Sequence, residues 1–342
     1  MNATTYGLDI AKQVFQMYWV DAETGEIVNR RFGREALIEF LATRRAGRVV
    51  MEGCGSAHWW ARKIGLLGHE VVLLHAKFIR PFVQNNKTDA ADARAIWTAV
   101  QQPEVRRVAV KSEDQQAILG LHRIRAQLVK FRTMQVNQLR GLLYEYGVVF
   151  RAGRQAGLAE VRRRMEDLEQ SLPGLLRQAV DEQLKRIDQL DEEIEALERR
   201  IGSWQKQEAG CQAIGEIPGI GKLTATALVA TIGDGKAFKS GREFAAYLGL
   251  VPRQSGTGGR VKLLGISKRG DVYLRTLLIH GARCVLFKAK HKGTWSEGLL
   301  KRRPTNVVIT ALANKMARTA WAIVAHGRTY QKDYVSVKPA WD

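Results

Sequence analysis

Two aspartates three residues apart, Asp89 and Asp92, are the residues of this sequence best suited to shared chemistry. The polar start and the alanines around them predict a helix that begins here and enters a core at Ile96 and Trp97. Residues three apart lie on one face of a helix, so both carboxylates would project together near its positive N-terminal end. The pair therefore predicts part of a cation site.

Two further acids lie in segments that otherwise predict buried strands. Asp9 follows Tyr-Gly-Leu at 6–8, and Glu52 ends the apolar run Val-Val-Met at 49–51. A carboxylate in a core strand is costly unless a partner cancels its charge. Four carboxylates with few cations around them indicate a divalent metal.

The elements around these acids alternate between strands and helices. We expect a β-hairpin (strand 6–20, turn 21–26, strand 27–32), then a helix at 34–45, a strand at 48–52, a helix ending at 68 and a strand at 71–74. This order predicts an α/β layer sandwich with a mixed sheet. In such a sheet Asp9 and Glu52 could approach each other on neighbouring strands.

The chain is strongly basic, with 54 Lys and Arg against 34 Asp and Glu, a net charge of +20. A polyanionic partner, most simply nucleic acid, is the direct expectation. A ribosome-like or merely soluble basic protein would show the same balance, and an anionic membrane surface is a weaker candidate. No apolar run approaches the roughly 18 residues needed to span a bilayer.

Three cysteines without Cys-x-x-Cys spacing indicate reduced thiols and a cytosolic, bacterial setting.

Long helices are expected from 115 to 146 and again up to about residue 204. The second helix has apolar residues in heptad steps, which are Val180, Leu184, Ile187, Leu190, Ile194, Leu197, Ile201 and Trp204. A short coiled coil is the expected structure. The spacing does not reveal whether this seam pairs within the chain or between protomers, and we favour a contribution between protomers because long seams are common dimerising devices.

The C-terminal third contains two candidate phosphate-binding segments. Residues 217–222 have the glycines of a helix-hairpin-helix turn, although a tight turn between packed helices would use the same residues. Residues 252–260 predict a flexible Gly/Ser loop, either a mobile phosphate clamp or a surface turn. Within it Ser255 could attack a phosphodiester while Arg253 and Arg260 hold the charge, although no histidine base lies beside it.

Basic side chains and turn glycines are the candidate nucleic-acid contacts. Between residues 253 and 303 there are thirteen Lys and Arg but only two acids. We assign nucleic-acid contacts to Lys87, Arg94, Gly219, Gly221, Lys222, Arg253, Arg260, Lys262, Lys268 and Arg269.

Six motifs in this order resemble the DEDD transposases of bacterial insertion sequences, which are described as bridge-RNA-guided recombinases. They are GLDIAK at 7–12, MEGCG at 51–55, KTDAADAR at 87–94, IPGIG at 217–221, GLVPR at 249–253 and GISKRGD at 265–271. Each motif is weak alone, but their order and spacing together are specific. The resemblance covers nearly the whole chain, from residue 6 to about residue 325.

The resemblance implies an α/β plus α architecture. Residues 1–110 would form a RuvC-like, ribonuclease-H-type domain, 111–205 a coiled-coil region, 206–330 a mostly helical transposase domain, and 331–342 a tail. The acidic tetrad would be Asp9, Glu52, Asp89 and Asp92, holding Mg²⁺. The nucleophile would be Ser255, with Ser267 as the alternative, because the segment after Arg253 is two residues shorter than in the family.

The resemblance also implies partners and a reaction. A guide (bridge) RNA from the element would pair with donor and target double-stranded DNA, and the protein would form a homodimer that assembles into a tetramer. A cytoplasmic, nucleoid-associated location without membrane contact follows. Ser255 would form a covalent link to DNA, so no ATP is needed. Two alternatives stay open: a RuvC-type metal-dependent junction nuclease in which water attacks, and a non-catalytic nucleic-acid scaffold.

Overall fold

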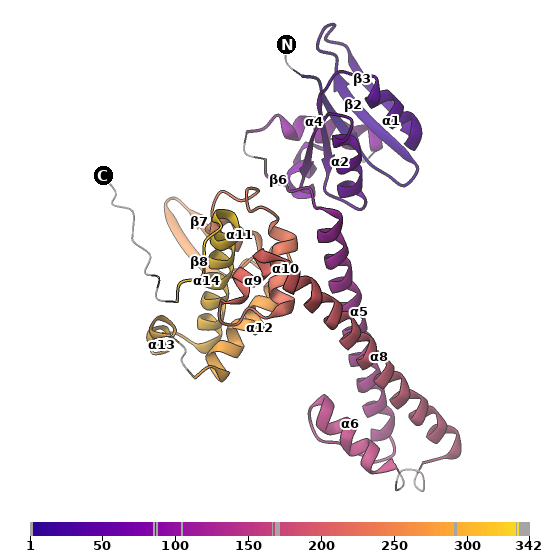
Figure 1. Cartoon of the computed structure of the whole chain (residues 1–342), viewed down its shortest axis with the longest axis vertical. Helices are drawn as coiled ribbons and strands as arrows, with labels where there is room; N and C mark the ends of the chain where they lie inside the picture. The colour runs from indigo at the N-terminus through magenta and orange to yellow at the C-terminus, as the bar shows by residue number, and fades with distance from the viewer. Residues whose placement is uncertain are drawn as a thin grey trace. The chain divides into compact units, whose positions relative to one another are not determined.

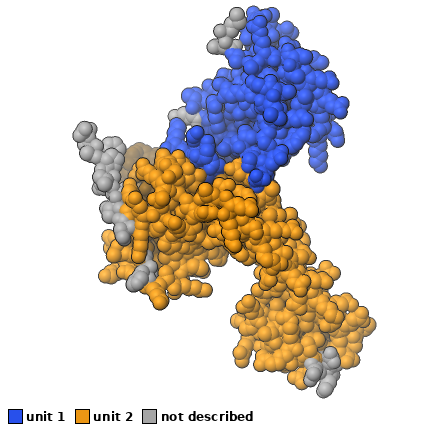
Figure 2. All heavy atoms as spheres, viewed as in Figure 1, with its two compact units in different colours: residues 1–114, 232–239 blue, residues 115–231, 240–342 orange. Residues whose placement is uncertain are grey.

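The chain divides into two compact units, each with its own core. The computed structural model describes residues 3–84, 86, 88–103, 105–165, 167, 172–290, 293–332 and 334. Unit 1 comprises residues 1–114 and 232–239, and unit 2 comprises 115–231 and 240–342 (Figure 2). The predicted segment 206–330 falls mostly in unit 2, and most of the predicted tail, 331–342, lies outside the described residues.

Unit 1 is a mixed six-stranded sheet with helices on both faces (Figure 1). Its elements are β1 (Thr5–Asp9), β2 (Val14–Val20), β3 (Ile27–Gly33), α1 (Arg34–Ala42), β4 (Arg48–Glu52), α2 (Ala57–Gly65), β5 (Glu70–Leu74), α3 (Ala76–Ile79), η1 (Arg80–Phe82), α4 (Asp89–Val100) and β6 (Arg107–Val108). The strand order is β3-β2-β1-β4-β5-β6, with β1, β4 and β5 parallel. The predicted mixed α/β sheet is confirmed, and its order is compatible with a RuvC-like fold.

The predicted single strand at 6–20 is wrong in extent. It is two strands, β1 and β2, which pair antiparallel with Asp9 opposite Gln16. The chain reverses over residues 10–13, where Lys12 and Gln13 interrupt the apolar run. The predicted hairpin is therefore a three-stranded meander, and β1 pairs with β2 on one side and with β4 on the other.

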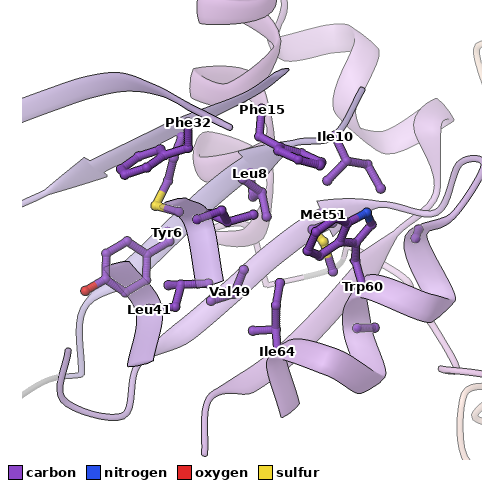
Figure 3. Close-up of a cluster of buried hydrophobic side chains, with 14 of the residues drawn as sticks. Tyr6, Leu8, Ile10, Phe15, Phe32, Leu41, Val49, Met51, Trp60 and Ile64 are labelled. Atoms are coloured by element: carbon purple, nitrogen blue, oxygen red, sulfur yellow. The ribbon is translucent and has the colours of Figure 1, made fainter. Parts of the chain in front are cut away.

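Both faces of this sheet are buried, which explains the unbroken apolar run in β4. On one face Leu8, Val49 and Met51 pack against α1 and α2 around the fully buried Trp60 (Figure 3). On the other face Val50 packs in the cluster that includes residues of α4. Because side chains alternate along a strand, Asp9 and Glu52 belong to the face that α4 covers.

Unit 2 begins with an antiparallel pair of long helices, α5 (Glu113–Tyr144) and α8 (Gly174–Gln207), with α6 (Arg154–Arg163) beside it (Figure 1). Arg125 bonds Glu198, and Arg132 bonds Asp191. Moving seven residues forward on α5 thus moves the contact seven residues back on α8. This is the register of an antiparallel helical hairpin.

The heptad seam of α8 is occupied within its own chain. Leu184 and Ile187 are buried in one cluster with Leu139 and Leu143 of α5, and Ile201 packs with Ile118. Our expectation that this seam joins two protomers is therefore wrong for these residues. The sequence could not distinguish the two cases because a seam has the same spacing whichever helix covers it.

A buried polar network fastens this hairpin to the C-terminal helices. His122 of α5 is 2% exposed; its ring nitrogens lie 2.9 Å from the hydroxyl oxygens of Tyr273 and Thr226. Burial, followed by the nearby Arg125 charge, lowers the pKa of His122 to about 4. The imidazole is therefore neutral at physiological pH and serves as a hydrogen-bonding link.

The lowered pKa of His122 predicts that acid weakens the buried network in which this imidazole takes part. Unfolded histidine binds a proton near pH 6.5 and folded His122 only near pH 4, so between these values the unfolded chain holds more protons. Stability should be full above about pH 6.5 and fall by roughly 2 to 4 kcal/mol as pH drops to about 4. Melting curves of His122→Gln should lose this part of the pH dependence, whereas His280→Gln, at an exposed position of the same unit, should retain it.

The remainder of unit 2 is mostly helical, as expected, with one β-hairpin. Its elements are α9 (Ala209–Gly215), α10 (Lys222–Ile232), α11 (Gly241–Tyr247), β7 (Pro252–Thr257), β8 (Arg260–Ile266), α12 (Val272–Lys288), α13 (Thr294–Leu300) and α14 (Thr305–His326). Among the described residues, α14 is the helix long and apolar enough to cross a membrane. Its buried residues, including Ala313, Ala317 and Ala320, pack inside unit 2, so it serves as a core helix.

The predicted flexible loop at 252–260 is instead an antiparallel hairpin, β7-β8. Its turn consists of Gly258 and Gly259, both with positive φ, which is the conformation that glycine adopts readily. Every residue of β7 is exposed. Composition suggested flexibility, but the glycines are concentrated where a tight hairpin needs them.

Candidate active site

The first acidic pair sits at one end of the central strands of unit 1. Leu8 of β1 pairs with Met51 of β4 in parallel register, so the next residues, Asp9 and Glu52, end adjacent strands side by side. The predicted approach of these strands is confirmed. Both side chains are half-buried and lie on the face that α4 covers.

Helix α4 crosses this face in direct contact with the β1 backbone. A Cβ on Gly7 would lie 2.4 Å from the carbonyl oxygen of Ala93, so only glycine permits this approach. The Trp97 indole nitrogen donates to the carbonyl of Thr5, at the opposite end of β1 from Asp9. The helix therefore runs antiparallel to β1, and its N-terminus points toward the acidic edge.

The first turn of α4 is tied to the same edge by an amide relay. Gln16, opposite Asp9 in the β1–β2 register, donates to Asn29 at 2.5 Å, and Asn29 donates to the carbonyl of Ala90 at 3.1 Å. Thr88 caps the helix by accepting from Ala91. The predicted helix start is thus confirmed, and it lies beside the residues that flank Asp9.

The two acids of α4 differ in their surroundings. Asp89, the first residue of the helix, is exposed, whereas Asp92, one turn on, is half-buried. Cys54 lies two residues after Glu52, and its thiol is affected by the nearby carboxylates. Its thiol pKa is raised by partial burial first and then by the Glu52 and Asp9 carboxylates. Both carboxylates therefore act on the Cys54 thiol in the same direction as burial.

Four carboxylates are a suitable donor set for a hard divalent cation. In this structure, however, the four side chains do not surround one common point. Across the part of the chain that the structure describes, no three Asp, Glu, His or Cys side chains lie close enough together to hold a metal ion. Asp9 and Glu52 form the fixed half of the predicted site. The α4 acids would have to move closer before all four could share one ion.

The serine predicted as nucleophile lies in unit 2, on β7. Ser255 is exposed and lies directly opposite Lys262 across the hairpin. The next pair toward the turn is Gly256 and Val261. Arg260 lies two residues before Lys262 on β8, so its side chain belongs to the same face as Ser255. A hollow of about 340 Å³, lined by residues 254–261, runs along this hairpin. One face of the hairpin therefore presents a hydroxyl beside two cations.

The alternative serine is placed differently. Ser267 follows β8, and its N–H donates to the carbonyl of Val251 at 2.8 Å, where the hairpin joins the body of unit 2. Its Oγ is buried and has no hydrogen-bond partner among the described residues. A phosphodiester could reach Ser255 without rearrangement, whereas reaching Ser267 would require the base of the hairpin to open.

A buried guanidinium fixes the base of the hairpin. Arg275 of α12 is 7% exposed and donates from Nη1 to the carbonyls of Leu248 at 2.9 Å and Arg269 at 3.0 Å. These carbonyls precede β7 and follow β8. Asp271, one of the two acids in the basic stretch, caps α12 by accepting from Leu274. The basic stretch thus contains structural charges as well as candidate contacts.

The predicted helix-hairpin-helix residues have separate roles in the structure. A Cβ on Gly219, whose φ is +89°, would lie 2.7 Å from the carbonyl oxygen of Gly281 in α12, so packing alone requires glycine there. Gly221 is exposed at the start of α10. The Lys222 amine lies 3.2 Å from Glu198 of α8 and remains partly exposed. For Gly219 the packed-turn alternative accounts for the residue.

The other predicted contact residues are mostly on the surface. Arg94 of α4, Arg253, Lys268 and Arg269 are exposed, and Lys268 adopts a left-handed φ of 54°. Lys87 lies outside the described residues.

Sequence reasoning missed the residues that position these groups. Arg275 and His122 lie in helical patterns that resemble ordinary core or surface positions, and no local signal distinguishes them. Gly7 did carry a signal, because a glycine inside an apolar strand often marks a close backbone approach. Lys262 could be placed opposite Ser255 only after the segment was known to be a hairpin.

Comparison with known families matches both halves of the chain. A family model for DEDD transposases of the IS110 type, described as a transposase, matches residues 6–148. A second, described as the transposase IS116/IS110/IS902 family, matches residues 211–295. The matched segments contain the acidic edge and the β7-β8 hairpin, respectively. Both family models describe transposases.

Full-length relatives agree with these matches. The chain is 44% identical over 336 residues to a protein of Pseudomonas aeruginosa described as a probable family 20 transposase, covering 97% of this chain and 99% of the relative. It is 39% identical to the transposase for insertion sequence element IS1328 of Yersinia enterocolitica, with the same coverage. It is 38% identical to the transposase for IS1111A of Coxiella burnetii, over 95% of this chain and 90% of the relative. The chain belongs to the IS110/IS116 family of insertion-sequence transposases, enzymes that cut and rejoin DNA.

Proposed function

We propose that this transposase recombines DNA through a covalent link between Ser255 and a DNA phosphate. The observation that supports this most directly is the exposed Ser255 hydroxyl on one hairpin face with Lys262 and Arg260. The two cations would hold the non-bridging phosphate oxygens and stabilise the charge that develops on attack. Serine Oγ would bond to phosphorus as the DNA 3′ or 5′ oxygen leaves with a proton, and reversal of this step would rejoin strands.

The acidic edge of unit 1 is the proposed partner of this serine. Asp9, Glu52, Asp89 and Asp92 would hold Mg²⁺, which would supply positive charge to a phosphate. Asp9 and Glu52 end adjacent strands, and the side chains of Asp89 and Asp92 would have to turn toward that pair to complete the donor set. The carboxylates lie in unit 1 and Ser255 in unit 2, so the proposed reaction draws on residues of both units.

The proposed nucleic-acid partners are donor and target double-stranded DNA and a guide (bridge) RNA encoded by the element. The net charge of +20 supports a polyanionic partner of large extent. Residues 1–110 would act as the catalytic RuvC-like domain and 206–330 as the transposase domain. Activity on DNA also supports a cytoplasmic, nucleoid-associated location.

The proposed test is direct detection of the covalent product. A suicide DNA substrate is incubated with the protein, Mg²⁺ and the element's RNA, and then separated on a denaturing gel. An adduct in the wild type that is missing in Ser255→Ala supports the proposal. The competing function is a RuvC-type nuclease, which the acidic edge alone would support, and it predicts cleavage without any adduct.

We further propose that protomers associate through α5 into a homodimer and then a tetramer. Because the α8 seam is covered within the chain, a different surface must serve. Leu121, Ile124, Leu128 and Phe131 follow heptad steps on α5, and Ile124 and Phe131 remain 49% and 42% exposed. A second copy could cover this apolar stripe and complete a four-helix arrangement.

Charged substitutions in this stripe should separate the protomers. Ile124→Asp combined with Phe131→Asp should shift the protein to a monomer in sedimentation velocity, because burying two carboxylates in an apolar contact is strongly unfavourable. Thr133→Asp combined with Asn137→Asp, at exposed positions of α5 outside the stripe, should leave the assembly unchanged. An unchanged oligomer in the first variant would exclude this surface.

A further inference from the structure

An exposed tryptophan on unit 1 packs against a buried neighbour. Trp59 lies in the first turn of α2 and is 40% exposed. Its ring meets that of Trp60 edge to face at 4.7 Å, and Trp60, 1% exposed, meets Phe15 at 4.8 Å. Figure 3 shows Trp60 inside the core beside Phe15, Ile10 and Met51. The exposed ring therefore packs on one side against a side chain of the core.

Two cations lie over the Trp59 ring, so a base that stacks there would have to displace at least one of them toward its phosphates. The Lys63 amine lies 5.4 Å from the centre of the Trp59 ring, and the Arg34 guanidinium lies 5.8 Å from it. Arg34 also lies 4.8 Å from the centre of the Trp60 ring. Within unit 1 the arrangement combines an aromatic face with positive charge on an exposed surface. That combination suits an unpaired nucleotide, whose base stacks while its phosphates meet cations.

The Trp59 ring is connected to the acidic edge. Arg34 Nη1 donates to the carbonyl of Lys12 at 2.9 Å, and Lys12 lies three residues after Asp9. Helix α2 begins five residues after Glu52, so Trp59 lies at the same end of the sheet as the two carboxylates but on the opposite face, the one that α2 covers. A strand crossing the acidic edge could therefore reach Trp59 by passing over this end of the sheet.

We infer that Trp59 stacks on an unpaired base of the DNA strand at the acidic edge, with Lys63 and Arg34 contacting the adjoining phosphates. This inference rests on the proposed function of that edge. Stacking requires a base face that is not covered by duplex neighbours, so the site would favour single-stranded DNA next to the cut. Holding such a base would offset part of the energy needed to open the duplex.

The test separates base stacking from phosphate attraction. Fluorescence anisotropy measures the affinity of the full-length protein for labelled oligothymidylate and for an abasic oligomer of equal length. Trp59→Leu should weaken binding to oligothymidylate by about 5- to 100-fold and leave abasic binding unchanged, whereas Trp59→Phe should retain most of it. Lys63→Gln should weaken both oligomers and reduce the salt slope by about one ion.

A matched control is available in the other unit. Trp295 is 43% exposed and has the Lys315 amine 5.0 Å from its ring, so Trp295→Leu removes a similar side chain elsewhere. Equal losses in both leucine variants, or no base-dependent loss in Trp59→Leu, would overturn the inference. So would a Trp59 effect seen with RNA and not with DNA. The Ser255 adduct assay tests the proposed function separately. If the adduct forms but Trp59→Leu causes no base-dependent loss of binding, this inference is overturned and the proposed function is not.

Discussion

Replacing Ser255 with alanine is expected to abolish the covalent protein–DNA adduct and to lower recombination by at least about 10⁴-fold, as removal of a nucleophile does in other enzymes. The physical reason is that alanine offers no oxygen to receive the phosphate. Because Ser255 is exposed on β7, the substitution should leave the melting temperature unchanged. Loss of activity would then be chemical and not structural.

The matched control is Ser267→Ala, at the base of the same hairpin. Its Oγ is buried without a partner among the described residues, so removing it should be tolerated and the adduct should persist. An adduct that persists in Ser255→Ala but disappears in Ser267→Ala would transfer the nucleophile to Ser267. DNA cleavage without any adduct, surviving in Ser255→Ala, would instead indicate a hydrolytic nuclease.

Neutralising the fixed acidic pair is the second large effect. Asp9→Asn and Glu52→Gln should each lower DNA cleavage by about 10²- to 10³-fold, the usual consequence of losing one group that stabilises transition-state charge. Asp92→Asn should act in the same direction, because this half-buried residue lies in the first turn of α4. Cleavage of a labelled substrate over a Mg²⁺ titration measures both the rate and the metal concentration required.

The control for these variants is Glu23→Gln, an exposed carboxylate in the turn between β2 and β3. It should cleave at the wild-type rate. If Asp9→Asn also retained the wild-type rate, Asp9 would be an ordinary polar residue and cleavage would not depend on it. A raised Mg²⁺ requirement in Asp9→Asn would support a shared ion, since one ligand charge is lost.

The outcomes of these two experiments are independent. The nuclease alternative requires the acids and not Ser255, whereas the recombinase requires both. A protein that loses cleavage in Asp9→Asn and loses only the adduct in Ser255→Ala would be a nuclease whose serine captures a side product. Loss of both activities in both variants would show that the reaction requires Ser255 and the acidic residues together.

The sequence by itself determined much of unit 1. Apolar runs ending in Asp9 and Glu52 predicted adjacent strands, and the cap and alanines after Thr88 predicted the start of α4. These predictions succeeded because strand and helix periodicities are local, and a buried acid is recognisable by its neighbours. Glycines 258 and 259 were also visible, but their role as a hairpin turn was mistaken for loop flexibility.

Only the tertiary structure decided which elements meet. The α8 seam has the same spacing whether α5 or another protomer covers it, and packing against α5 settled the case. Lys262 became the neighbour of Ser255 through strand pairing, and Trp59 became an exposed ring packed against the core because Trp60 turned into it. Periodicity specifies which face of an element is apolar, whereas the partner of that face depends on contacts between residues far apart in the chain.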